Sequence, residues 1–319
     1  MVKKLSIIIP VYCNAEALPI LVSQLSALAN SARSARRAEI EVVFVVDGDP
    51  DGSHVWLSKA LVNASFASQL LLHTRNFGSF AAIRSGLKAA EGDYFAVIAA
   101  DLQEPPELAL QFLEKLEKNQ FDVVVGSRRN RDDPLGTRLA SLIFWRLYKQ
   151  FVVRDIPVNG VDVFGCNQVF RDQLLSFNEA NSSMVGQIFW LGFRRTEVLY
   201  DRAERLHGKS AWTLRKKVNY MFDSIFSFTD LPIRLLTFFG LFGLLISMIL
   251  GSVVLVAKLL GGIDVPGYAA TVLIVIFFSG LNSLGLGVVG NYAWRAFENT
   301  KGRPLSVVME FQRFYGKEN

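Results

Sequence analysis

Two long uncharged stretches constrain the fold of this chain more than any other feature. Residues 235–257 and 268–290 carry no charged side chain. Each is on the order of 20 residues long, the length that a helix needs to cross the hydrocarbon core of a bilayer. A buried core helix is the alternative, but neither stretch has a polar face and the two lie close together. We therefore expect a hairpin of two transmembrane helices.

Basic residues flank this hairpin on the outside, whereas the loop between the helices offers only Lys258 against Asp264. Lysine and arginine mark the cytoplasmic side of a membrane protein. We therefore expect an integral membrane protein of the bacterial inner-membrane type, with the large N-terminal domain and both termini in the cytoplasm. Small residues four apart, such as Ser283 and Gly287, permit close helix packing and leave a homo-oligomer open.

Short apolar strands alternate with helical patterns over residues 1 to about 200. Such alternation predicts an α/β fold with a mostly parallel, Rossmann-like sheet covered on both faces. Ligands of these sheets bind at the carboxyl ends of the strands. The expected strands are residues 5–9, 41–46, 70–73, 94–99 and 123–125, and the expected helices are 17–29, 80–90 and 106–118.

Two further segments, 138–153 and 212–228, mix basic residues with apolar and aromatic ones. Both are expected to form amphipathic helices on the membrane surface, with Trp145, Trp212 and Phe222 at the interface. Packing of these aromatic side chains into the domain is the alternative.

The net charge of +5 suits nucleic acid, anionic lipid or phosphorylated small molecules equally well, so it selects none of them. The two cysteines have no paired spacing, which indicates a reducing compartment.

The GxGxxG pattern at residues 285–290 lies inside the second apolar stretch, so helix packing explains it better than dinucleotide binding. Residues 47–52 resemble the start of a calcium loop, but Ser58 stands where the bidentate glutamate belongs.

The stretch from Ala100 to Glu107 carries the clearest chemical signal. It follows an apolar strand, so Asp101 stands at a strand end, with the amide of Gln103 two residues on. These oxygens can hold Mg²⁺ or Mn²⁺ against a diphosphate and neutralise its charge as it leaves. A solvated turn in which Asp101 caps the next helix is the alternative.

A second polar segment, residues 200–212, places arginine, lysine, glycine and serine in a loop just before the membrane segments. Arg202, Arg205 and Lys209 can clamp a phosphate group. Attraction of juxtamembrane basic residues to anionic lipid is the alternative. The position between domain and bilayer favours a lipid phosphate.

Taken in order, these motifs resemble those of family 2 glycosyltransferases with the GT-A fold. More narrowly, the chain is similar to polyprenyl-phosphate glycosyltransferases, which include bactoprenol glucosyltransferases and dolichol-phosphate mannose synthases. The resemblance covers nearly the whole chain. It rests on residues 8–12, 46–48, 75–78, 100–106, 125–131, 160–164, 190–194, 202–210 and 301–304.

The resemblance implies an inverting transfer of a hexosyl group from a nucleotide-sugar to a polyprenyl phosphate, for modification of cell-envelope glycans. UDP-glucose is the first expectation for the donor and GDP-mannose the second; nucleic acid is not expected as a partner. Asp162 is the implied catalytic carboxylate, and Asp101 and Gln103 the implied metal ligands. The implied nucleotide-sugar residues are Pro10, Tyr12, Glu16, Asp47, Asn76, Asp101 and Arg128. The implied lipid-phosphate residues are Arg131, Arg202, Arg205, Lys209 and Ser210.

Two positions depart from the family pattern. Ala99 replaces the first aspartate of the Asp-x-Asp motif, and Val46 stands where the second strand often carries Asp or Asn. A catalytically degenerate membrane scaffold is therefore an alternative function. A processive family 2 enzyme would carry a QxxRW-type motif and more spans, and neither is found. The expected domains are a catalytic domain (1–210), a juxtamembrane segment (211–233), the hairpin (234–292) and a C-terminal tail (293–319).

Overall fold

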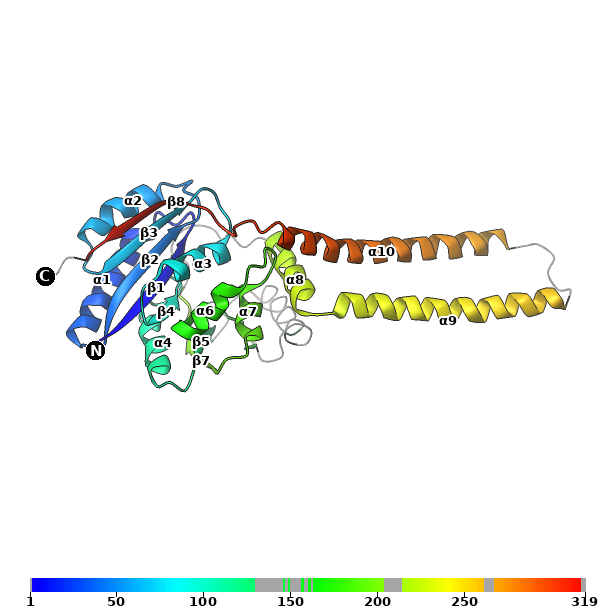
Figure 1. Cartoon of the computed structure of the whole chain (residues 1–319), viewed down its shortest axis with the longest axis horizontal. Coiled ribbons are helices and arrows are strands. Elements are labelled where there is room, and N and C mark those ends of the chain that lie inside the picture. The colour runs from blue at the N-terminus through cyan, green and yellow to red at the C-terminus, as the bar shows by residue number, and fades with distance from the viewer. Residues whose placement is uncertain are drawn as a thin grey trace.

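An eight-stranded sheet organises the N-terminal part of the chain, with the strand order β7-β5-β6-β4-β1-β2-β3-β8 (Figure 1). The computed structural model describes residues 2–129, 146, 149, 156–157, 160–161, 163–203, 214–260 and 267–316. The strands are β1 (Lys3–Val11), β2 (Ala38–Val46), β3 (Ala67–His73), β4 (Tyr94–Val97), β5 (Val123–Arg128), β6 (Val163–Asn167), β7 (Arg195–Tyr200) and β8 (Val308–Phe314).

The sheet is mostly parallel, as the sequence predicts. Strands β1 to β4 run parallel to their neighbours within that group, and β5 runs parallel to β7. Strands β6 and β8 run antiparallel to theirs. The chain proceeds from β1 outward to β3 and then returns to place β4 on the other side of β1. In open α/β sheets such a reversal marks the place of the ligand crevice, so we expect that crevice here at the carboxyl ends of β1 and β4.

Helices cover both faces of the sheet, because successive strand residues point to opposite sides. On β1, Ile7 and Ile9 belong to the core under one group of helices, whereas Ile8 belongs to the core under the other. The first group is α1 (Leu18–Ser34), α2 (Ser53–Ala60) and α4 (Leu108–Glu117), and a short 3₁₀ turn, η1 (Leu61–Asn63), follows α2. The second group is α3 (Ser79–Ala89), α6 (Gln168–Ser176) and α7 (Met184–Trp190).

A buried charge stabilises the amino-terminal edge of the sheet. The carboxylate of Glu41 accepts hydrogen bonds from the Ser6 hydroxyl (2.5 Å), the Gln69 amide (2.9 Å) and the Glu91 N–H (2.9 Å). It also forms an ion pair with Lys4 (3.2 Å). Burial raises the pKa of Glu41, but the three hydrogen bonds and Lys4 outweigh burial and lower the pKa below its ordinary value. This cluster joins β1, β2 and β3 at the edge opposite the strand ends that bear the candidate site.

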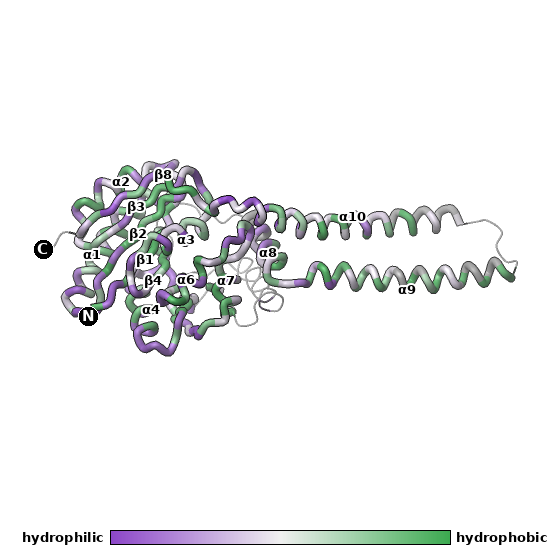
Figure 2. Tube along the Cα trace, in the orientation of Figure 1, coloured by the Kyte–Doolittle hydropathy of each residue, from purple (hydrophilic) through white to green (hydrophobic). Residues whose placement is uncertain are grey.

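Two long helices, α9 (Leu231–Leu259) and α10 (Tyr268–Thr300), project from the α/β part side by side (Figure 1). Figure 2 shows that hydrophilic residues are sparse along most of these two helices, whereas hydrophilic and hydrophobic residues are mixed in the α/β part. Phe238 on α9 is 62% exposed and Phe277 on α10 is 65% exposed. Among the described residues, one segment, Leu231–Val253, is long and apolar enough to cross a membrane.

The chain after α10 returns to the sheet, a feature that the sequence analysis did not predict. Within the expected C-terminal tail, β8 pairs antiparallel with β3, with an irregularity between Leu72 and His73. The Ser58 hydroxyl donates to the Gln312 side chain (2.8 Å), and Arg313 forms an ion pair with Glu91 (2.7 Å). Residues 308–314 therefore form one strand of the same sheet.

Polar contacts join the base of the two long helices to the α/β part. Helix α8 (Leu214–Phe228) lies within the expected juxtamembrane segment, and the hydroxyls of its Tyr220 and of Ser183 lie 2.6 Å apart. Arg295 on α10 donates to Asp223 on α8 (2.7 Å) and to the carbonyl oxygen of Asn181 (3.2 Å). The base of α10 is thus attached both to α8 and to the loop before α7. The expected helix at 138–153 lies largely outside the described residues, as does Trp212.

Candidate functional site

Asp47, at the carboxyl end of β2, organises the loop that follows β3. Its side chain is buried, with the residue only 2% exposed. One carboxylate oxygen accepts hydrogen bonds from the Phe77 N–H (2.8 Å) and from His73 Nδ1 (2.8 Å), and the other accepts from the Gly78 N–H (2.7 Å). Asp47 therefore orders the loop of residues 75–78, which we call the donor loop because two of its N–H groups donate to this carboxylate.

Gly48 allows the donor loop to approach β2 closely. Its φ angle of 78° lies in the left-handed region, and a Cβ atom here would stand 3.0 Å from the backbone nitrogen of Asn76. Within the donor loop, the Arg75 guanidinium lies over the Phe77 ring at 4.1 Å from its centroid. Asn76 is exposed beside them. The loop thus presents a cation and an amide at the strand ends.

The loop after β1 forms the neighbouring rim. Tyr12 is 37% exposed, Pro10 is half-buried and Glu16 is exposed. Asp51 holds this loop by accepting the Ala15 N–H at 2.9 Å. An exposed aromatic ring at the end of a central strand can stack on a nucleotide base, because every base has a flat π face.

The turn after β4 has a constrained backbone. Leu102 is buried and has a φ of 60°, a conformation that a bulky residue rarely adopts. Asp101 is buried, and its carboxylate accepts the Gln103 N–H at 3.3 Å. Backbone conformations of this kind cluster at functional sites. The turn brings the two side chains predicted as metal ligands to the crevice between β1 and β4.

The segment after β7 lies against this turn. The Ala203 N–H donates to the Gln103 carbonyl oxygen (3.0 Å), and the Gln103 side-chain amide donates to the Ala203 carbonyl oxygen (3.3 Å). Arg202 donates to the Gln103 side-chain oxygen and lies 3.8 Å from the buried carboxylate of Glu104. Two motifs about 100 residues apart in sequence, one assigned to the metal and one to the lipid phosphate, therefore meet at the same place.

Strand β5 brings further arginines to this edge. Because β5 runs parallel to β7, Arg128 is opposite Tyr200 in the register. Arg128 is half-buried. Arg129 donates its N–H to the Tyr200 carbonyl oxygen (2.9 Å) and forms an ion pair with Asp201 (3.3 Å). The predicted phosphate residues Arg128 and Arg202 thus both lie at the ends of adjacent parallel strands.

The predicted metal ligands, Asp101 and Gln103, fit a divalent cation in part. Asp101 supplies a carboxylate of the kind that Mg²⁺ and Mn²⁺ prefer. The side-chain oxygen of Gln103 already accepts a hydrogen bond from Arg202, and a cation at that oxygen would face the guanidinium charge. Among the described residues, no group of three or more His, Cys, Asp or Glu side chains could hold a metal.

Several predicted site residues fall outside the described part of the chain: Arg131, Asp162, Arg205, Lys209 and Ser210. The strand that follows Asp162 is described. Strand β6 begins at Val163, and its Phe164 pairs with Val97 of β4 and with Val125 of β5.

Sequence reasoning missed three polar residues near Asp47: His73, Ser85 and Ser306. His73 and Ser85 are buried, and Ser306 is half-buried. His73 has hydrogen-bond partners at both ring nitrogens, Asp47 and Ser85. Ser306 belongs to the segment that joins α10 to β8. Its place beside β3 depends on the pairing of β8 with β3, two strands more than 200 residues apart in sequence.

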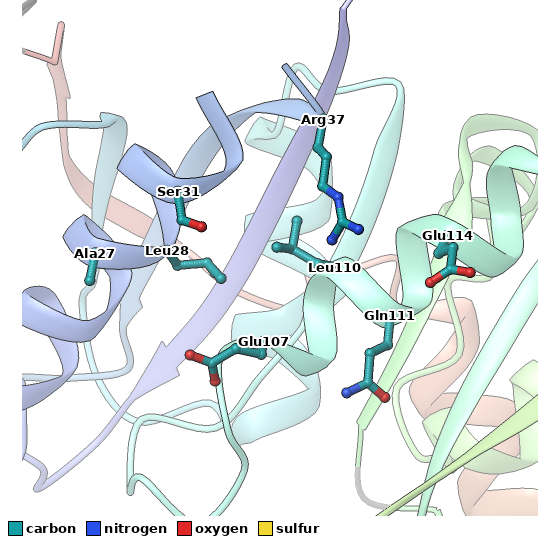
Figure 3. Close-up of a pocket in the computed structure, with 8 residues that line it drawn as sticks. All are labelled: Ala27, Leu28, Ser31, Arg37, Glu107, Leu110, Gln111 and Glu114. Atoms are coloured by element: carbon teal, nitrogen blue, oxygen red, sulfur yellow. The ribbon is translucent and has the colours of Figure 1, made fainter. Parts of the chain in front are cut away.

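A surface hollow elsewhere does not match the expected ligands. It lies between α1 and α4, on the helical layer rather than at the strand ends (Figure 3). The carboxylates of Glu107 and Glu114 line it, with Arg37 as the basic residue. Two carboxylates would repel a sugar diphosphate.

Comparison with known proteins identifies the family of this chain. The model of the family described as glycosyl transferase family 2 matches residues 6–177. An uncharacterised glycosyltransferase of Synechocystis sp. is 30% identical over 314 residues, covering 97% of this chain and 96% of that protein. The bactoprenol glucosyl transferase of Shigella phage SfII is 30% identical over 315 residues, covering 97% of this chain and 99% of that protein. A solved mannosyltransferase from Pyrobaculum calidifontis is 14% identical, with a TM-score of 0.48 over 92% of this chain and 88% of that one. The chain belongs to glycosyl transferase family 2.

Proposed function

We propose that this glycosyltransferase moves a hexosyl group from a nucleotide-sugar to a polyprenyl phosphate, with inversion, at the cytoplasmic face of a membrane. The observation that carries the proposal is the contact between the Asp101–Gln103 turn and Arg202. A site that joins a sugar diphosphate to a phosphate must bring two anions together and offset their repulsion. Carboxylate, amide and guanidinium groups in contact provide the ligands for both tasks.

Relatives support the acceptor. Proteins named bactoprenol glucosyl transferase align with 97% of this chain, including α9 and α10. The exposed apolar surface of both helices supports a membrane hairpin, for which hydrocarbon would replace water as the solvent. The return of the chain to β3 adds a topological argument. Strands β1 and β8 belong to one sheet and so lie on the same side of any membrane. If α9 crosses the membrane, the chain must therefore cross it a second time before residue 308.

In this proposal the donor occupies the crevice between β1 and β4. Tyr12 stacks on the base, with Pro10 and Glu16 beside it, and Asn76 and Arg128 contact the sugar diphosphate. Asp101 would hold Mg²⁺ or Mn²⁺ with Gln103 as the second ligand, and Arg202 would contact a phosphate. The metal would neutralise charge on the leaving diphosphate.

The acceptor side combines Arg202 with residues outside the described part of the chain. Arg131, Arg205, Lys209 and Ser210 would hold the lipid phosphate, and Asp162 would be the catalytic carboxylate. A phosphate monoester has its second pKa near ~6, so its oxygen is already a nucleophile at neutral pH and needs no strong base. A single displacement at the sugar carbon inverts its configuration. We propose UDP-glucose as the first donor and GDP-mannose as the second.

Purified full-length protein in detergent tests the proposal directly. It is given labelled UDP-glucose or GDP-mannose, undecaprenyl phosphate, and Mg²⁺ or Mn²⁺, with EDTA as the metal control. A lipid-linked monosaccharide is the expected product. A polymer would indicate a processive enzyme, and the absence of turnover with every donor would refute the transferase proposal.

The alternative is a degenerate scaffold, suggested by Ala99 and Val46. The structure gives Val46 another explanation, because its side chain is fully buried in the core under α1, α2 and α4. A side chain at position 46 points into this core and not into the crevice. Valine in place of Asp or Asn therefore removes no ligand-binding group from the crevice. Ala99, half-buried two residues before Asp101, remains the one observation that favours the scaffold.

A further inference from the structure

Four side chains form a continuous hydrogen-bonded chain from the donor loop to the segment after α10. His73 Nδ1 lies 2.8 Å from Asp47 Oδ1, and His73 Nε2 lies 2.9 Å from Ser85 Oγ. Ser85 Oγ lies 2.8 Å from Ser306 Oγ. The four come from β2, β3, α3 and the segment between α10 and β8. Asp47 and His73 are almost completely buried, at 2% and 1% exposed.

The chain has a consistent direction. The Asp47 carboxylate only accepts, so His73 Nδ1 carries a hydrogen and donates to it. In the neutral imidazole Nε2 then accepts from the Ser85 hydroxyl, whose oxygen in turn accepts from the Ser306 hydroxyl. Each group satisfies the next, and Ser306 is the terminal donor. Loss of the Ser306 hydroxyl would remove the last link without disturbing a charged group.

Packing fixes the two inner members of this chain. Gly86 lets α3 lie directly on the sheet, because a Cβ atom there would come within 2.5 Å of the Ile8 side chain. The neighbouring Ser85 is therefore held close to the sheet. The ring of His73 also packs edge-on against Phe77, with centroids 5.6 Å apart. His73 thus contacts the donor loop both through Asp47 and directly.

The segment that bears Ser306 is attached to the same region through its backbone. The Thr74 N–H donates to the Val307 carbonyl oxygen at 3.0 Å. Val308 then pairs with His73, at the irregularity in the β3–β8 register. The chain returning from the long helices is therefore in contact with residues 73 and 74, which lead directly into the donor loop.

The hydrogen bonds among Asp47, His73 and Ser85 connect the same residue types as a hydrolase triad. Their surroundings fit a structural role, which is to hold the donor loop in place. Ser85 is buried, and its hydroxyl is hydrogen-bonded to Ser306 as well as to His73. Asp47 is also occupied by the N–H groups of Phe77 and Gly78. A nucleophile has to be accessible to substrate, whereas a support has to be rigid.

We propose that Ser306 is a positioning residue for nucleotide-sugar binding. Through Ser85 and His73 it fixes Asp47, which in turn orders the donor loop. The segment that follows the long helices thereby completes the donor site from outside the sheet's own loops. This inference rests on the proposed function, in which the donor loop contacts the nucleotide-sugar.

A pair of matched serine variants of the full-length protein tests the inference. Ser306→Ala removes the terminal link, and Ser58→Ala removes a different serine hydrogen bond to the same returning segment, to Gln312 (2.8 Å). Binding of UDP-glucose or GDP-mannose with Mn²⁺ is measured by calorimetry, and KM is measured for donor and undecaprenyl phosphate separately. Ser306→Ala should weaken donor binding roughly five-fold, the effect of about one hydrogen bond, and leave the acceptor KM unchanged. Ser58→Ala should change neither.

Three further measurements separate positioning from general stability. Hydrogen exchange at the Phe77 and Gly78 amides should be faster in Ser306→Ala and unchanged in Ser58→Ala. Ser306→Thr keeps the hydroxyl and should restore donor binding. Ser85→Ala combined with Ser306→Ala should weaken donor binding no more than Ser85→Ala alone, because both act through one chain.

The outcomes distinguish this inference from the function on which it rests. If the wild-type protein binds nucleotide-sugar and Ser306→Ala binds it equally well with unchanged amide exchange, the inference is wrong and the proposed function stands. Equal losses of donor binding in Ser306→Ala and Ser58→Ala would also overturn it, since they would indicate a general effect of β8 docking. If the wild-type protein binds no nucleotide-sugar, both proposals fail.

Discussion

Replacing Asp47 by asparagine should weaken donor binding strongly while leaving the overall fold in place. The carboxylate accepts three hydrogen bonds of 2.7–2.8 Å in a buried setting. A hydrogen bond to a charged group contributes about 1.5–3 kcal/mol, against about 0.5–1.5 kcal/mol for a neutral one. Loss of charge therefore costs about 1 kcal/mol per bond, or about 3 kcal/mol in total.

Asparagine also creates a conflict between donors. One side-chain oxygen can still accept from Phe77 and His73, but the NH₂ group then faces the Gly78 N–H. Because these contacts order the donor loop, most of the cost should appear as weaker donor binding. At about 1.4 kcal/mol per factor of ten, 3 kcal/mol corresponds to a loss of up to roughly 100-fold. We expect a 10- to 100-fold rise, in order of magnitude, in the Kd for UDP-glucose with Mn²⁺.

Calorimetry on the detergent-solubilised full chain measures this Kd, and Asp49→Asn is the matched control. Asp49 lies two residues away and accepts a backbone hydrogen bond, from His54 at 3.0 Å. Asparagine retains an oxygen that can accept it, so the control should bind donor normally. A Kd in Asp47→Asn within a factor of two of wild type would refute the assignment of Asp47 as the organiser of the donor loop. A switch in preference between UDP and GDP donors would instead indicate direct contact with the base.

Three other perturbations probe separate parts of the molecule. Asp101→Asn should lower kcat at least roughly 100-fold at saturating donor, because the metal loses its charged ligand; wild-type activity would remove the metal assignment. Arg295→Ala should lower the thermal midpoint of the solubilised protein, since it removes a half-buried ion pair with Asp223 worth about 1–2 kcal/mol, whereas Arg295→Lys should retain part of it. Glu41 has a lowered pKa in the folded state. Its contribution to the stability of the fold is therefore complete above its ordinary pKa of 4.5, and it is lost as the pH falls through the lower pKa of the folded state. The denaturation midpoint of the wild-type protein, measured from pH 7 to 3, should therefore fall at the acid end. Glu41→Gln should have a lower midpoint than wild type at pH 7, and its midpoint should change less with pH.

Most of the sheet could be predicted from sequence because its strands are buried on both faces. Val42 to Val46 form a continuous apolar run, and such runs indicate central parallel strands. The predicted strands near residues 5–9, 41–46 and 70–73 are β1, β2 and β3, each longer in the structure than in the pattern. Edge strands gave weaker signals. Strand β8 has mixed polarity and only exposed or half-buried residues, as expected for a strand with one neighbour, and nothing in its local sequence distinguishes it from a tail.

The site was predictable where chemistry follows a strand end. Asp101 and Arg128 both stand there, and parallel pairing brings such ends to one edge. The internal use of Asp47 was not predictable, because a strand-end aspartate that binds a ligand and one that holds a neighbouring loop share the same sequence signature. Only the pairing of β2 with β3 shows that Phe77 and Gly78 direct their N–H groups to this carboxylate.

Strand β8 changes how the two parts of the molecule depend on one another. A tail that merely followed the long helices would leave the α/β domain complete at β7. Here the sheet includes residues 308–314, so this edge strand is available only after α9 and α10 have been made. Pairing of β8 with β3 then seats Ser306 next to Ser85, and through His73 it reaches Asp47. If Asp47 orders the donor site as proposed, that site depends on the two long helices, because the start of α9 and the end of α10 must both face the α/β domain for β8 to pair with β3.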